Sequence, residues 1–218
     1  MDGEVGLALP VLASSHISLP VLRLTPLLAI AYSYFETLIR LNDPIHFEAE
    51  EARMWSLNNL LNTAGFRQDI YMDFVEETIN LLRLISESIS SPHNPAHGRS
   101  VLLDKFNDPG VSSAIITHFR LLTSAWMKSR PAAYQPFILD GTVEQYCANQ
   151  IEPYQVEIEH IGMNALIDVV IRPAGFAVEI VYLDRSAGSE VNEHRFEPTR
   201  KIDSTNVEPT PLRLLYRP

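Results

Sequence analysis

One cysteine in 218 residues excludes an internal disulfide framework and a four-cysteine zinc site. Basic side chains are also scarce, because 17 Lys and Arg face 27 Asp and Glu and leave a formal net charge of −10. This charge would repel a polyanion and no basic stripe compensates for it, so we expect no nucleic-acid partner. The sequence also lacks an apolar run of the roughly 18 residues that span a bilayer, and we expect no membrane partner.

The N-terminal segment differs in character from the rest of the chain. It carries few charges, several prolines and no sustained hydrophobic period, so we expect residues 1–25 to form an irregular arm. A secretory signal needs a basic start and an unbroken apolar stretch, whereas this segment begins with Asp2 and Glu4 and is interrupted by Pro10. We therefore predict a cytoplasmic protein with one domain at residues 26–218.

The larger, N-terminal part of this domain has the hydrophobic spacing of amphipathic helices. Leu27, Ala31, Tyr34 and Leu38 are separated by four, three and four residues and form one apolar stripe. We expect this helix to begin at Thr25, because threonine caps helices and the proline after it suits the first turn. Similar patterns predict further helices at 44–65, 70–89, 101–106, 111–130, 143–150 and 163–171.

Glycine and proline mark the breaks between these helices. Gly65 is a natural C-terminal breaker for the helix that precedes it. Residues 91–98 (SPHNPAHG) have the composition of a loop, and residues 107–110 (NDPG) have that of a turn.

The hydrophobic period changes in the last quarter of the chain. Residues 176–184 are β-branched and apolar on both faces, which is typical of a central strand. Residues 211–217 alternate as a strand with one wetter face does, and the polar stretch 185–210 is expected to be loop with a short strand. The sequence therefore predicts an α+β fold, with a large helical part packed on a small C-terminal β-sheet.

Seven segments of the chain share a recognisable order and spacing: 29–40, 118–138, 143–153, 159–170, 178–186, 191–196 and 212–218. In this they resemble the otubain family, the OTU-type cysteine peptidases or ubiquitin thioesterases that cleave ubiquitin from proteins. The resemblance covers roughly residues 29–218 and implies a papain-like OTU fold. It also implies ubiquitin or polyubiquitin as the partner, and it raises a ubiquitin-conjugating enzyme as a second partner.

Cleavage by a thiol needs an ionised cysteine, a histidine base and donors for the oxyanion. The family's cysteine lies in an Asp-Gly-Asn-Cys string just before an Ala-Ile-Ala-Tyr helix, whereas residues 22–28 here read LRLTPLL, with Thr25 at the cysteine position. The family's histidine follows a Leu-Tyr-Arg-Pro string within Gly-His-Tyr-Asp, which would lie beyond Pro218. The resemblance therefore assigns no catalytic residue to this chain, whose domain we interpret as truncated at its C-terminus.

Neither of the two possible substitutes for the nucleophile is convincing. A threonine hydroxyl is a weak nucleophile without a positioned base, and a helix cap explains Thr25 fully. Cys147 lies four residues after Val143 on an expected helical stripe. We expect it to be a buried, unreactive thiol, since cysteine is among the most frequently buried residue types.

The histidines give no metal site, and we predict neither a metal nor a cofactor. His93 and His97 are four residues apart, but Pro95 breaks the helix that would bring them together, so a solvated loop is expected. His118 is expected to be packed on its helix or at the rim, and His160 to lie at a helix start.

One histidine is a candidate for binding. His194 lies in the string VNEHRF, and the resemblance places this Asn-x-His-x-Phe pattern on the family's ubiquitin-binding surface. Asn192, His194 and Phe196 are therefore predicted contacts for ubiquitin. The alternative, a hairpin residue whose hydrogen bonds are satisfied locally, stays open.

Three functions compete at this point. The first is an otubain-like protein that binds ubiquitin but, as written, does not hydrolyse its isopeptide bonds. The second is an active ubiquitin thioesterase of which this chain is a faulty or alternative translation. The third is a non-enzymatic helical adaptor with no ubiquitin function.

Overall fold

The computed structural model describes residues 26–90, 97–182, 192–200, 202 and 211–216. The predicted irregular arm, Thr25 and most of the loop predicted at 91–98 lie outside these residues. The described helices are α1 (Pro26–Leu41), α2 (Pro44–Ser56), α3 (Asn58–Thr63), α4 (Gln68–Ser90), α5 (His97–Asn107), α6 (Pro109–Lys128), α7 (Pro131–Tyr134), α8 (Val143–Tyr146) and α9 (His160–Leu166).

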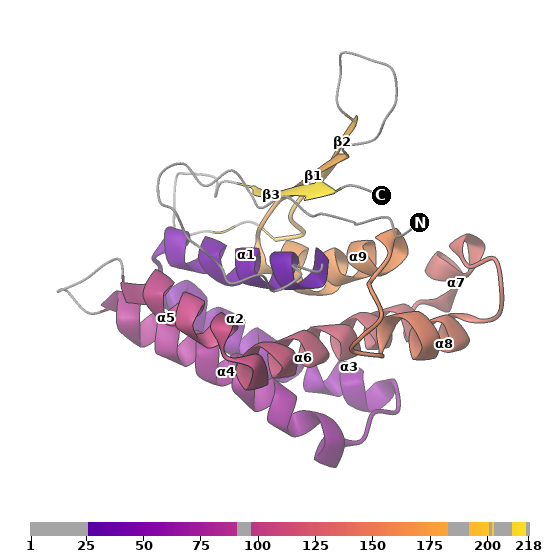
Figure 1. The fold of residues 1–218 in the computed structure, drawn as a ribbon, viewed down its shortest axis with the longest axis horizontal. Helices are drawn as coiled ribbons and strands as arrows, with labels where there is room; N and C mark the ends of the chain where they lie inside the picture. Colours follow the sequence, from indigo (N-terminus) through magenta and orange to yellow (C-terminus); the bar gives the residue numbers. More distant parts are fainter. Residues whose placement is uncertain (1–25, 91–96, 183–191, 201, 203–210, 217–218) are drawn as a thin grey trace.

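The helices and a small sheet form three layers (Figure 1). The sheet covers a middle layer of α1 and α9, and α2 to α6 lie on the other side of that layer. The apolar stripe predicted on α1 is confirmed, since Leu27, Ala31, Tyr34 and Leu38 are at most 1% exposed. Burial of each large apolar side chain of this kind contributes about 1.5–3 kcal/mol, which explains why α1 forms the centre of the core.

Three of the predicted element boundaries were wrong. The helix expected at 44–65 is two helices, α2 and α3, which meet at Leu57, although Gly65 does end the second one with a φ of +87°. The turn expected at 107–110 is largely helical, because Asp108 caps α6, which begins at the proline after it. The loop expected at 91–98 is also too long, since His97 is the first residue of α5.

The helices predicted at 143–150 and 163–171 are confirmed, but each ends in a π-turn followed by a proline. Helix α8 continues into η2 (Cys147–Ile151), and α9 continues into η3 (Ile167–Ile171) and the 3₁₀ turn η4 (Arg172–Ala174). Carbonyl groups at these ends accept hydrogen bonds from arginines of other helices. Arg120 of α6 donates to the carbonyl of Ile151, and Arg53 of α2 donates to those of Val169 and Val170.

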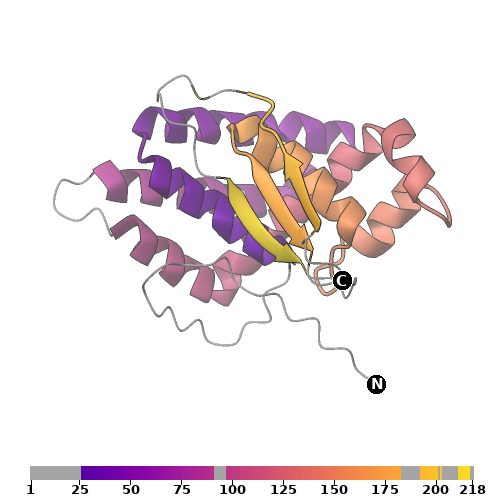
Figure 2. The same ribbon diagram turned by 90° about the horizontal axis from the view of Figure 1, so that it is seen from above.

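The sheet has the strand order β2-β1-β3, where β1 is Val178–Tyr182, β2 is Asn192–Phe196 and β3 is Leu212–Tyr216. As predicted, β1 is central and shares the sheet with the C-terminal strand, to which it is parallel. Strand β2 pairs with β1 in the antiparallel sense. Figure 2 shows the sheet lying across α1 and α9, with β3 on the α1 side and β2 on the α9 side.

The two faces of the sheet differ in polarity more than the sequence indicated. The helix-facing side buries Ile180 and Leu214, as expected of strands that cover a core. The outer side carries Glu179, the second residue of β1, and its carboxylate accepts hydrogen bonds from Arg195 of β2 and Arg213 of β3 at 2.6 Å each. The prediction that β1 is apolar on both faces was therefore wrong at Glu179.

Candidate ubiquitin-binding surface

The structure places Cys147 away from solvent, as the sequence predicted. Its side chain is fully buried, and its Sγ lies 3.9 Å from the carbonyl oxygen of Ser124. Burial raises the pKa of the thiol to about 11, so it is protonated at neutral pH. Because the thiolate is the nucleophilic form, Cys147 does not provide a reactive sulfur.

The three predicted ubiquitin contacts lie together on β2. Asn192, His194 and Phe196 alternate along the strand and therefore share one face. Asn192 and His194 are exposed, whereas Phe196 is half-buried against the core. The rings of His194 and Phe196 meet edge to face, with their centroids 4.6 Å apart.

Residues of α9 extend this patch in a way that the sequence did not predict. His160, the first residue of α9, has a pKa lowered by burial and by the charge of His194, so the two imidazoles are neighbours. Asn164 lies one turn further along, with its Nδ2 3.4 Å from Nδ1 of His160. We call the surface made by His160, Asn164, His194 and Phe196 the β2–α9 surface.

The end of α9 is tied to the chain that follows β2. Arg172 pairs with Asp168, one turn before it, at 2.5 Å. Its Nε donates to the carbonyl oxygen of Glu197 at 2.7 Å, and its own carbonyl accepts from the amide of Thr199 at 3.0 Å. These bonds hold β2 in place along the exposed side of α9.

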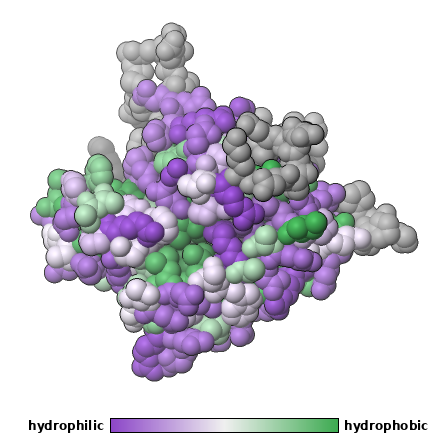
Figure 3. Space-filling view, turned by 180° about the vertical axis from the view of Figure 1, so that it is seen from behind, coloured by the Kyte–Doolittle hydropathy of each residue, from purple (hydrophilic) through white to green (hydrophobic). Residues whose placement is uncertain are grey.

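An apolar arm, residues 131–141, flanks α9 as well. The arm is anchored by buried Tyr134, whose pKa is raised by burial and by the charge of Asp168, which places the phenol near η3. Two of its large apolar side chains instead face solvent, with Phe137 65% and Leu139 95% exposed, while Ile138 between them is buried. The same region forms the apolar area at the left edge of the view in Figure 3.

The exposed arm has a defined conformation. Gln135 braces it, because its Nε2 donates to the carbonyl of Gly141 at 3.0 Å and its Oε1 accepts from the amide of Val143 at 3.2 Å. Thr142 and Gln145 then form a capping box at the start of α8. The arm thus presents Phe137 and Leu139 to solvent on a loop whose conformation is held by hydrogen bonds.

Sequence reasoning missed the arm and the α9 residues for different reasons. The arm could have been predicted from the apolar residues between Pro131, Pro136 and Gly141. Apolar residues in a short segment broken by proline and glycine cannot form a buried helix stripe, which indicates that some of them are exposed. No local signal linked His160 and Asn164 to β2, because the contact joins segments about thirty residues apart in sequence.

The described part of the chain was also searched for a metal site and for a membrane-spanning helix. It contains no cluster of three or more metal-ligating side chains, and His97 lies exposed at the start of α5 while His93 is outside the described residues. None of the described helices has the length and apolar character needed to cross a membrane.

A layered core with a central helix beneath a small mixed sheet defines an α+β protein, as predicted. Comparison with family models makes the assignment specific: the model for Peptidase C65 Otubain matches residues 28–218. The chain belongs to the otubain family, and the resemblance found in the sequence is confirmed.

Similar proteins of known name agree with this assignment. The OVARIAN TUMOR DOMAIN-containing deubiquitinating enzyme 1 of Arabidopsis thaliana is 29% identical over 200 residues, which are 86% of this chain and 61% of the relative. The ubiquitin thioesterase otubain-like of Caenorhabditis elegans is 33% identical over 181 residues, 83% of this chain and 58% of the relative. The chain thus spans about three fifths of the length of these relatives.

Solved structures show the same fold. One is the structure of h/ceOTUB1 with ubiquitin aldehyde and UBCH5B~Ub, which has a TM-score of 0.71 and 30% sequence identity, and covers 89% of this chain and 69% of that one. Another is a complex of ceOTUB1, ubiquitin aldehyde and UBC13~Ub, with a TM-score of 0.71 and 29% identity over 89% of this chain and 72% of that one. The predicted OTU-type fold is therefore confirmed.

Proposed function

We propose that this chain binds ubiquitin or polyubiquitin through the β2–α9 surface and the apolar arm. The observation that carries the proposal is the pair of exposed His194 and half-buried Phe196, whose rings meet edge to face on β2 beside His160. The family assignment supports it, because the relatives are named as ubiquitin thioesterases or deubiquitinating enzymes. The domain responsible is residues 26–218, and we place the protein in the cytoplasm.

The chemistry of the surface suits a folded protein partner. Aromatic rings at the centre of an interface supply much of the binding energy, and Phe196 and Phe137 are available for that purpose. The polar side chains of His160 and His194, both at the surface, suit the hydrogen-bonded part of such an interface. A ubiquitin-conjugating enzyme is proposed as a second partner, in view of the related complexes that contain UBCH5B~Ub and UBC13~Ub.

We propose further that the chain as written does not hydrolyse ubiquitin conjugates. Its single thiol is Cys147, which is buried and has a pKa raised to about 11 by that burial. A hydrolytic thiol needs the opposite environment, with access to the substrate and a lowered pKa.

Calorimetric titration with mono-ubiquitin and with linked chains tests the binding. We expect a measurable affinity that falls about tenfold or more when His194 and Phe196 are both replaced by alanine, because these side chains form the centre of the patch. His97→Ala, an exposed histidine on α5, is the matched control and should bind as the unmodified chain does. Absence of binding in every titration would overturn the proposal and favour the adaptor.

An electrophilic ubiquitin probe tests the proposal that the chain does not hydrolyse ubiquitin conjugates. The probe should leave the chain unlabelled over hours at neutral pH, while an active ubiquitin thioesterase treated in parallel is labelled. Labelling at Cys147, located by peptide mass spectrometry, would show that the thiol is catalytically accessible and would refute the proposed lack of hydrolysis.

A further inference from the structure

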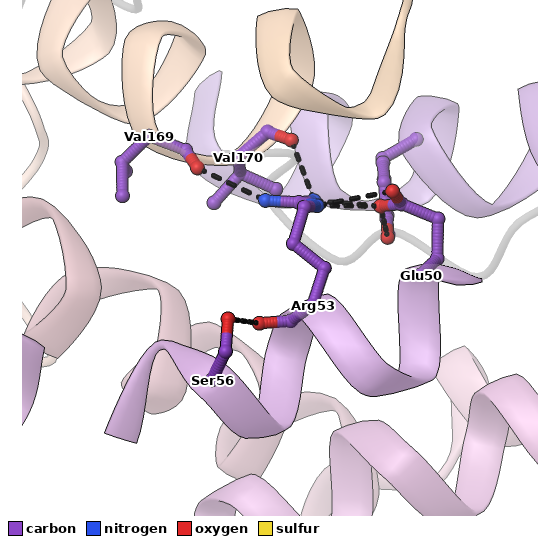
Figure 4. Close-up of polar contacts among 6 residues, drawn as sticks. Glu50, Arg53, Ser56, Val169 and Val170 are labelled. Carbon is purple, nitrogen blue, oxygen red and sulfur yellow. Dashed lines mark hydrogen bonds and ion pairs between the residues drawn. The ribbon is translucent and has the colours of Figure 1, made fainter. Parts of the chain in front are cut away.

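A buried polar network lies between α1, α2 and η3 (Figure 4). The hydroxyl of Tyr34 donates to Oε2 of Glu50 at 2.8 Å, and Arg53 donates to the same carboxylate from Nε and Nη2. Glu50 is fully buried. The other side of the Arg53 guanidinium points to η3, where it donates to the carbonyls of Val169 at 3.2 Å and Val170 at 2.9 Å.

The sequence around η3 explains why the carbonyl of Val169 needs a donor from another helix. In a regular helix the carbonyl of Val169 would accept from the amide of the residue four positions on, which is Pro173. Proline has no amide hydrogen, so the bond cannot form. Arg53 supplies the missing donor, and its planar fork contacts Glu50 and the two carbonyls at the same time.

The pKa values of Arg53 and Tyr34 also favour this arrangement. Burial by itself lowers the pKa of Arg53, but the Glu50 carboxylate and the Tyr34 hydroxyl raise it above its ordinary value. Burial and the Glu50 charge raise the pKa of Tyr34 well above its ordinary value, so the phenol stays a neutral donor. Arg53 therefore stays charged and Tyr34 stays neutral through the neutral pH range.

The segment that Arg53 holds leads directly to the β2–α9 surface. Asp168 and Arg172 lie on either side of the two carbonyls, and they pair with one another. Arg172 then bonds to Glu197 and Thr199, the residues that follow Phe196. A displacement of η3 would therefore move the end of β2 relative to α9, and with it the ring of Phe196.

We propose that Arg53, oriented by Glu50 and Tyr34, is a positioning residue for the β2–α9 surface. It acts through η3 and Arg172, and it contacts no partner itself. This inference rests on the proposed binding of ubiquitin and assigns a role in that binding to residues from the opposite side of α9.

The test separates positioning from simple stabilisation. Arg53→Lys keeps the charge but loses the planar fork of donors that joins Glu50 to the two carbonyls, and Tyr34→Phe removes a single hydroxyl as a milder second variant. Met54→Ala removes buried apolar volume from the same helix outside the network and serves as the matched control. Each variant is compared for melting temperature, ubiquitin affinity and amide hydrogen exchange at residues 167–172 and 194–199.

We expect Arg53→Lys to weaken ubiquitin binding about fivefold or more and to speed exchange in both segments. Met54→Ala should lower the melting temperature while affinity and exchange in these segments are retained. If Arg53→Lys and Met54→Ala lower the melting temperature equally and also weaken ubiquitin binding equally, the inference is overturned. So would unchanged exchange at 194–199 in both Arg53→Lys and Tyr34→Phe, a result that bears on positioning even if ubiquitin binding itself fails.

Discussion

His118 provides a sharp test of how the core is held together. It lies on α6 with no exposed surface, and its Nδ1 is 2.9 Å from Oγ1 of Thr78. The Thr78 hydroxyl donates its hydrogen to the carbonyl of Phe74 at 3.1 Å, so its oxygen accepts from His118 Nδ1–H. The neutral imidazole therefore carries its proton on Nδ1, and Nε2 lies buried without a hydrogen-bond partner among the described residues.

This environment disfavours protonation of His118. A second proton would place a charge and an unpaired N–H in the core, and burial accordingly lowers the pKa from 6.5 to about 3. The unfolded chain binds the proton at the ordinary pKa, so it takes up more protons than the folded chain between these two values. The stability due to neutral His118 is thus fully present above about pH 6.5 and is lost as the pH falls toward 3.

The expected loss of unfolding free energy follows from the lowered pKa of His118. Each pH unit below the unfolded pKa removes about 1.4 kcal/mol of unfolding free energy, so the loss at about pH 4.5 is about 3 kcal/mol. Urea unfolding at a series of pH values measures this free energy directly. His118→Asn is the matched variant, since its amide can still donate to Thr78 but cannot be protonated.

The comparison between the two proteins isolates His118 from the other titrating groups. The variant is expected to be less stable than the unmodified chain at neutral pH, because a smaller side chain leaves a cavity. The difference in unfolding free energy between the unmodified chain and the variant should fall by about 3 kcal/mol between pH 7 and pH 4.5. If the two stability curves stay parallel over this range, the neutral buried imidazole described here is wrong.

Two further predictions are independent of ubiquitin. Cys147, with its pKa raised to about 11, should resist iodoacetamide in the native protein at pH 8 and react once urea unfolds the chain; native-state alkylation at the unfolded rate would contradict its burial. Asp108→Ala removes the side-chain bonds to the amides of Gly110 and Val111 at the start of α6 and should lower the unfolding free energy by about 1 kcal/mol. Asp108→Asn, which preserves the cap, is its control, and equal loss in both variants would exclude capping as the cause.

Local sequence features predicted most of the fold. The stripe on α1, the glycine at 65 and the change of period at β1 each depend on neighbours within a few residues, which a sequence displays. The errors at Leu57 and at residues 107–110 arose where a helix ends and another begins without a loop. In such places the hydrophobic period continues and only the capping geometry, as at Asp108, marks the boundary.

The candidate site was predictable only in part. His194 and Phe196 could be found because they lie in one short string that resembles the family. His160 joins them only after β2 has been placed along α9, and Arg53 reaches Val169 across 116 positions of sequence. Contacts of that kind depend on tertiary packing, which periodicity and composition do not encode.

The Glu179 carboxylate has a consequence for how the sheet can assemble. It is nearly buried and lies opposite Arg195 on one neighbouring strand and Arg213 on the other. A slip of either strand by one position would turn its arginine to the other face and strand a negative charge without its counterion. A misaligned pairing therefore loses a counterion on the outer side as well as apolar burial on the inner side, so a single acid helps to keep the three strands in one alignment.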